Sequence, residues 1–259
     1  MAKTKSELLF EELLKKRKYK FLKGEDYFKK DEKCPDYIVK TEYGDIICEV
    51  KEFIEPEIHK LIQKQKVRTF SSKSILNPIK NKIRRASLQF KPYIRNNLPM
   101  IVILSNPYSY FVDLSNEEIL SAMFGEIGIS IPLMDGKEPE WFFGRDGILN
   151  NQKDYISAVC ILEYFPIKSK QIDAISKEIR NGHGDEELSI ELAHKMLLEF
   201  LEEIESLKKK GTVIRERKAL RLRVFHNFRA KIKLPIRIFK SRYDENYIFD
   251  EIKGSYLLS

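Results

Sequence analysis

Residues 35–51, PDYIVKTEYGDIICEVK, predict two short β-strands joined by a turn. Residues 37–39 form an apolar, β-prone run, and residues 42–45 contain the polar and glycine side chains that turns favour. Residues 46–53 then extend again as a second strand.

Side chains alternate across a strand, so Glu49 and Lys51 share the face opposite to the more apolar Cys48 and Val50. The return of the hairpin can bring Asp36 to the face of Glu49. Two carboxylates with room for water are typical of a Mg²⁺ site, and a neighbouring lysine can position or deprotonate a water molecule. An edge hairpin with a solvated, charged face is the alternative.

The order Pro35-Asp36 and then Glu49-Val50-Lys51 resembles the signature of the PD-(D/E)xK nuclease superfamily. The resemblance covers roughly residues 4–105. It implies an α/β, restriction-endonuclease-like core with a central mixed sheet flanked by helices. It also implies a nuclease that cleaves DNA, occasionally RNA, with Mg²⁺ or with Mn²⁺ as a substitute. Asp36, Glu49 and the backbone carbonyl of Val50 would hold the metal, and Lys51 would position the attacking water.

Residues 4–18 predict an amphipathic helix capped by Thr4 or Ser6, with an apolar stripe at Leu8, Leu9, Leu13 and Leu14. Many members of the superfamily place an acid from the first core helix beside the metal, and Glu7 resembles that acid. Glu11 and Glu12 remain alternatives. Ordinary surface glutamates on an amphipathic helix fit the pattern equally well.

Basic residues dominate one long stretch of the chain. Residues 58–112 contain eleven lysines and arginines and no acid, in a chain with a formal net charge of +8. Phosphate binding explains such a stretch, because each neutralised phosphate releases condensed counterions. The sequence therefore predicts a nucleic acid, expected to be DNA, as the partner. A solvated lysine face is the alternative.

A helix is predicted over residues 77–96, with Pro78 in its first turn. Gln89 and Tyr93 resemble the Q-x-x-x-Y motif of RecB-like nucleases, in which both side chains face the DNA path. Pro92 departs from a regular helix at this point. Lys82 and Arg85 are further candidate phosphate contacts on the same helix.

Two apolar runs, residues 100–105 and 156–164, predict buried strands of one sheet, and residues 116–124 predict a short helix. Composition changes after residue 168. We therefore expect a nuclease-like domain over residues 1–168. Residues 169–259 are expected to form a C-terminal α+β extension, with an amphipathic helix from about residue 185 to 209 followed by basic strands.

Several classes of function are disfavoured. The three cysteines form no CxxC pair, which indicates a reduced, cytoplasmic setting. No signal segment or apolar run of about 18 residues is present, so no membrane association is expected. The histidines lack zinc-site spacing, and no Walker motif or nucleophile elbow occurs.

Two functional hypotheses remain. The first is a metal-dependent nuclease. The second is a catalytically inactive nucleic-acid-binding or partner-docking module on the same fold. A homodimer or a partner protein is compatible with either hypothesis.

Overall fold

The computed structural model describes part of the chain, namely residues 3–28, 34–53, 72–108, 114–130, 140–150, 153–167, 217–250 and 255–258, with scattered positions between 195 and 206. The chain divides into two compact units. One comprises Met1–Glu163 and Leu220–Ser259, and the other comprises Tyr164–Ala219. The candidate site lies in the first unit, and the following description concerns that unit.

The predicted first helix and hairpin are confirmed. Helix α1 (Lys5–Lys16) begins with a capping box, in which the Thr4 side chain and the Glu7 side chain each accept a backbone N–H. Strand β1 (Lys20–Lys23) and the short helix α2 (Gly24–Phe28) follow. Strands β2 (Tyr37–Thr41) and β3 (Gly44–Glu52) then form the antiparallel hairpin, in which Cys48 lies opposite Tyr37.

An eight-stranded mixed sheet organises the unit, in the order β1-β2-β3-β4-β7-β8-β9-β10. Strand β4 (Met100–Ser105) is parallel to β3, and β7 (Ile156–Ile167) is parallel to β4, as expected for buried central strands. The remaining strands of this sheet are β8 (Arg217–His226), β9 (Glu245–Asp250) and β10 (Ser255–Leu258). Strands β5 (Ile127–Ser130) and β6 (Glu140–Phe143) pair in a separate two-stranded sheet.

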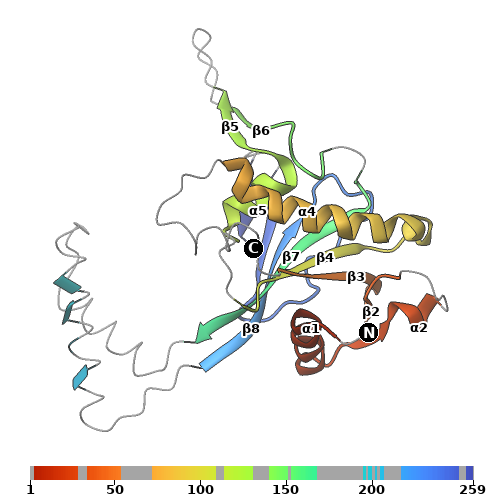
Figure 1. Cartoon of the computed structure of the whole chain (residues 1–259), viewed down its shortest axis with the longest axis horizontal. Coiled ribbons are helices and arrows are strands. Elements are labelled where there is room, and N and C mark those ends of the chain that lie inside the picture. Colours follow the sequence, from red (N-terminus) through yellow and green to blue (C-terminus); the bar gives the residue numbers. More distant parts are fainter. Residues whose placement is uncertain are drawn as a thin grey trace, which may run out of the picture. The chain divides into compact units, whose positions relative to one another are not determined.

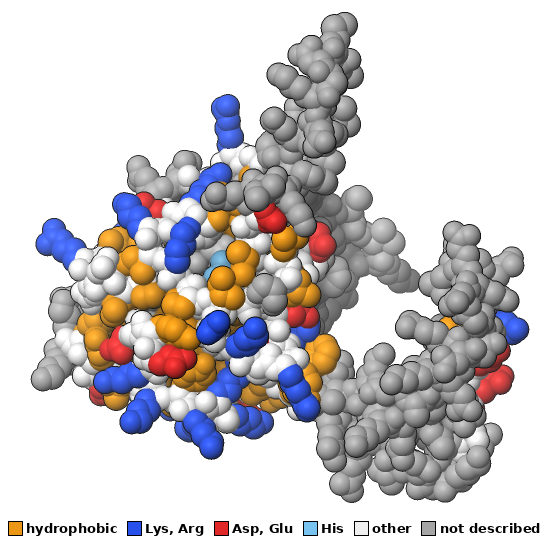
Figure 2. All heavy atoms as spheres, turned by 180° about the vertical axis from the view of Figure 1, so that it is seen from behind, with side chains coloured by type: hydrophobic (Ala, Val, Ile, Leu, Met, Phe, Trp, Pro, Cys, Tyr) orange, Lys and Arg blue, Asp and Glu red, His pale blue; other side chains and the backbone are white. Residues whose placement is uncertain are grey.

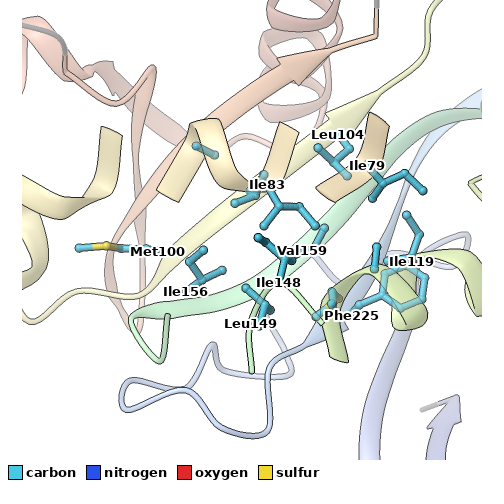
Figure 3. Packing of buried hydrophobic residues seen from close by; sticks show 14 of the residues in the cluster. Ile79, Ile83, Met100, Leu104, Ile119, Ile148, Leu149, Ile156, Val159 and Phe225 are labelled. Atoms are coloured by element: carbon cyan, nitrogen blue, oxygen red, sulfur yellow. The ribbon is translucent and has the colours of Figure 1, made fainter. Parts of the chain in front are cut away.

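Helices cover both faces of the sheet (Figure 1). On one face, α4 (Ser72–Phe90) and α5 (Asn116–Phe124) pack against alternate side chains of β3, β4 and β7. Figure 3 shows this cluster, with Ile79 and Ile83 of α4 near Leu104 and Val159 of the sheet. On the other face, α1 packs over Cys48 and Val50 of β3. The structure is therefore an α/β fold with a central mixed sheet flanked by helices.

Helix α4 differs from the prediction at both ends. It begins at Ser72 rather than near residue 77, so Pro78 lies inside the helix instead of in its first turn. The α-helix ends at Phe90, and residues Lys91–Asn96 form the 3₁₀ helix η1, which contains Pro92. A proline lacks the backbone N–H that would continue the α-helical ladder, which explains this change of helix type.

The division of the chain also differs from the predicted boundary at residue 168. Residues 220–259 belong to the same compact unit as residues 1–163, because β8, β9 and β10 extend the main sheet. The bidentate ion pair between Arg17 and Asp244, with N–O distances of 2.6 and 2.7 Å, joins these two parts of the chain.

The amphipathic helix predicted from about residue 185 to 209 lies largely outside the described residues. In the part of the chain that the structure describes, no helix is both long and apolar enough to cross a membrane.

Candidate active site

The β2–β3 hairpin brings Asp36 and Glu49 together. Tyr37 pairs with Cys48, and continuing this register by one residue places Asp36 opposite Glu49. The Asp36 backbone N–H donates to Glu49 Oε2 at 3.1 Å, and Asp36 Oδ2 accepts from the Val50 N–H at 2.7 Å. Each carboxylate is thus held by the backbone of the other strand, so the orientation of both depends on the register of the hairpin.

Lys51 completes this cluster. Its ammonium contacts Glu49 Oε1 and donates to Gln89 Oε1 of α4 at 2.6 Å. The Lys51 side chain is 18% exposed, whereas that of Glu49 is fully buried. The site therefore opens to solvent at Lys51 and at the partly buried Asp36, with Glu49 below them.

The hairpin does not lie at the edge of the sheet, as the alternative of a solvated edge hairpin requires, because β2 lies between β1 and β3, and β3 lies between β2 and β4. The site instead lies near the carboxyl end of β3, where Lys51 pairs with Leu104 of the parallel strand β4.

Burial raises the pKa of both carboxyl groups. It raises the pKa of Asp36 to about 6, against the lowering effects of the Val50 N–H and the Lys51 charge. Burial, and then the charge of Asp36, raise the pKa of Glu49 to about 8, although Lys51 opposes the shift. One ammonium therefore does not fully compensate two buried carboxylates.

Among the three candidate glutamates of α1, Glu7 is the one whose charge acts on Asp36, where it raises the pKa. Its Oε2 also accepts the Thr4 backbone N–H at 2.6 Å as part of the capping box. The N-terminus of α1 is fixed to β3 as well, because the Ser6 N–H donates to Glu52 Oε2 at 2.8 Å. The start of α1, which carries Glu7, is thus anchored to the strand that carries Glu49.

The two alternatives to Glu7 have other partners. Glu11 is buried and accepts from Tyr37 Oη at 2.9 Å, and it also pairs with Lys3 at 2.6 Å. Glu12 pairs with Lys16, one turn along the helix, at 2.6 Å. These contacts give Glu11 and Glu12 structural roles. Glu7 is therefore the acid of α1 whose charge acts on Asp36.

Helix α4 carries two cations on the face that also contacts Lys51. Lys82, Arg85 and Gln89 recur at the spacing of one helical face, and Gln89 contacts Lys51 directly. Burial, followed by the charges of Arg85 and Lys51, lowers the pKa of Lys82. Lys82 also lies 5.9 Å from the centre of the Phe53 ring. The charges of Lys51 and Arg85 both act on Lys82, so the two predicted phosphate contacts belong to the same positive region as Lys51.

Tyr93 does not take the position that the Q-x-x-x-Y spacing predicts. It is buried, its ring lies 4.1 Å from that of Phe28, and its hydroxyl donates to Cys34 Sγ at 3.2 Å. The change from α to 3₁₀ geometry after Phe90 turns Tyr93 away from the face of Gln89. A direct nucleic-acid contact by Tyr93 does not fit this placement, and the residue supports the segment that leads to Asp36.

Gly24 contacts the backbone of the site, a contact that no sequence motif indicated. The Gly24 N–H donates to the Asp36 carbonyl at 3.2 Å. A Cβ atom at this position would lie 1.8 Å from the Pro35 carbonyl oxygen, so only glycine allows the close approach. The only signal in the sequence was the glycine itself, because this residue type lets two backbone segments approach closely.

The acid-free stretch of residues 58–112 falls partly on residues that the structure does not describe. Of its described cations, Lys80 pairs with Asp146 at 2.6 Å, whereas Lys82 and Arg85 lie on the face of α4 described above. Figure 2 shows lysine and arginine side chains that project around one face of the molecule, with hydrophobic side chains and a few acids between them.

Asp36 and Glu49 are the side chains of the site that could hold a Mg²⁺ ion. Within the described residues, no three His, Cys, Asp or Glu side chains form a cluster of metal ligands. Mg²⁺, however, is commonly held by one or two carboxylates, with water and substrate phosphates as the other ligands. Asp36 and Glu49 supply two such carboxylates in a hydrogen-bonded pair, so the donor set fits the ion.

Comparisons of the chain with protein-family models, with curated proteins and with solved structures found no match. The functional assignment therefore depends on the geometry of the site.

Proposed function

We propose that the protein is a Mg²⁺-dependent nuclease that hydrolyses phosphodiester bonds of DNA, and that its core is of the restriction-endonuclease-like type. The observation that carries the proposal is the contact of Asp36, Glu49, Lys51 and Gln89 at one point between β2, β3 and α4. The order of helix, hairpin, helix and parallel strand around this point supports the same proposal.

Asp36 and Glu49 would hold the ion, with the Val50 carbonyl as a further oxygen ligand and Glu7 as a nearby negative charge. A bound Mg²⁺ would supply Lewis-acid chemistry, neutralising charge on the phosphate and lowering the pKa of a water molecule. Lys51 has three N–H donors, two of which are directed at Glu49 and Gln89 among the described residues. The third can bind the attacking water or a phosphate oxygen.

Gln89 has a positioning role in this arrangement. Its carbonyl oxygen accepts from the Lys51 ammonium, so it fixes the direction in which the remaining donor points. Lys82 and Arg85 extend the positive charge along α4, where the phosphates on either side of the scissile bond would lie.

The test is nicking of supercoiled plasmid DNA by the purified protein in Mg²⁺ or Mn²⁺. We expect nicking by the wild type, none above background with Lys51→Ala, and wild-type rates with Lys23→Ala. Lys23 is a matched control because it is a half-exposed lysine of β1 that pairs with Glu25. If the wild type and Lys51→Ala give equal signals on DNA and on RNA, the nuclease proposal fails and the inactive binding module takes its place.

A further inference from the structure

A second basic site lies at the opposite end of the β2–β3 hairpin. It is a cavity of about 400 Å³, and its lining includes Lys18, Tyr19, Lys20, Lys40, Tyr43 and Arg237. Lys40 of β2 follows Asp36, the residue directly before the strand, by four positions, which corresponds to about 13 Å at about 3.3 Å per residue. The cavity is therefore separate from the candidate active site.

The charge of this cavity is strongly unbalanced. Four cations line it, against the single acid Glu42. Lys20 and Lys40 face each other directly in the antiparallel pairing of β1 and β2. Like charges at directly opposed positions are destabilising. Within the described part of the chain, no acid forms an ion pair with either lysine, so an external anion is the natural partner.

One wall of the cavity, formed by Tyr19 and the segment of Arg237, is held in place by contacts within the protein. Tyr19 packs edge-on against Phe239 at 5.4 Å, and its hydroxyl accepts the Phe239 N–H at 3.1 Å. Arg17 donates to the Phe239 carbonyl at 2.7 Å, which holds the segment of Arg237 against α1. This wall is therefore preformed and loses little conformational entropy when a ligand binds.

Lys18 has a left-handed backbone conformation, with a φ of 59°. This conformation is unfavourable for a residue other than glycine. It directs the chain from α1 into β1, and thus sets where Lys18 and Lys20 meet the cavity.

We propose that this cavity is a non-catalytic binding site for the phosphate groups of a nucleotide, either free or within a nucleic-acid strand. The lysines and Arg237 would bind the phosphates, and the ring of Tyr43, which is 49% exposed, would stack on a base. A strand is the expected source. At about 3.4 Å per nucleotide, the 13 Å separation equals about four steps along the DNA, so one strand could reach both sites. This part of the inference depends on the proposed nuclease function.

The test uses Lys40→Glu, which would place opposite charges across from each other and should preserve or raise Tm. Lys23→Glu is the matched control, because it makes the same charge change on β1 outside the cavity. Binding of labelled single-stranded and duplex DNA of about 20 nucleotides, long enough to span both sites, is measured by anisotropy in EDTA. Cleavage does not enter this measurement, so the inference and the nuclease proposal can fail independently.

We expect Lys40→Glu to weaken DNA binding about tenfold and to lower the salt slope of log K by about one, while Lys23→Glu changes the affinity less than threefold. Tyr43→Ala should weaken single-strand binding about tenfold through lost stacking. Binding of adenosine triphosphate is measured in parallel by the thermal shift that it causes. If Lys40→Glu weakens the binding of adenosine triphosphate and leaves DNA binding unchanged, the source of the phosphates is a free nucleotide. The inference is overturned if Lys40→Glu and Lys23→Glu have equal effects with both probes.

Discussion

Glu49 is predicted to make the metal-free protein less stable as the pH rises. Its side chain is fully buried, and burial together with Asp36 raises its pKa from an ordinary value of 4.5 to about 8. The folded state therefore binds its proton more tightly than the unfolded state does. The stability that this proton provides is complete below about pH 4.5 and is lost as the pH rises to about 8.

The size of this loss of stability follows from the raised pKa of Glu49. The difference between 8 and 4.5 is about 3.5 pKa units, and at about 1.36 kcal/mol per unit this gives at most about 5 kcal/mol. Relaxation of the site and water at Lys51 reduce this figure, so we expect about 2–4 kcal/mol. Asp36 adds a smaller loss in the same direction as the pH rises to about 6.

Glu49→Gln removes the charge and retains an oxygen that can accept the Asp36 N–H. Urea unfolding followed by circular dichroism in EDTA, at about pH 5 and about pH 8, measures the consequence. The wild type should lose stability between these values, and Glu49→Gln should lose much less. Glu12→Gln, a change on the surface of α1, should follow the wild type. Parallel curves for the wild type and Glu49→Gln would show that Glu49 is not the uncompensated buried charge inferred above.

Three other predictions concern the same site. Mg²⁺ should raise the Tm of the wild type more at about pH 8 than at about pH 6, because protons and metal compete for the raised carboxylates, and Asp36→Asn should abolish the shift. Gly24→Ala should cost about 1–3 kcal/mol in urea unfolding and lower the cleavage rate, since its Cβ would clash with Pro35; a loss below about 0.5 kcal/mol would contradict this. Gln89→Ala should lower kcat about 10- to 100-fold with unchanged DNA affinity, whereas Tyr93→Phe should change neither; weaker DNA binding by Gln89→Ala would instead indicate direct contact with the substrate.

The hairpin could be predicted from the sequence because its determinants are local. Strand alternation and the turn fix which side chains share a face, and the register then places Asp36 opposite Glu49. The buried strands at residues 100–105 and 156–164 were predictable for a similar reason, since a continuous apolar run indicates a strand covered on both faces.

Other features depend on non-local contacts. The position of β8–β10 in the main sheet follows from pairing between distant strands, which periodicity does not encode. The position of Tyr93 depends on a change of helix type. In an α-helix, Gln89 and a residue four positions later lie about 40° apart, but at three residues per turn the separation grows to about 120°. The interaction of Gly24 with Asp36 arises only when α2 packs against the segment before β2.

The central claim is that Asp36 and Glu49 hold a divalent cation beside Lys51. Anomalous diffraction from crystals soaked in Mn²⁺ tests it most directly, because Mn²⁺ scatters anomalously where Mg²⁺ does not. We predict one strong peak about 2.1–2.2 Å from oxygens of Asp36 and Glu49, lost in crystals of Asp36→Asn. A peak elsewhere, or no peak at an Mn²⁺ concentration that raises Tm, would contradict the claim.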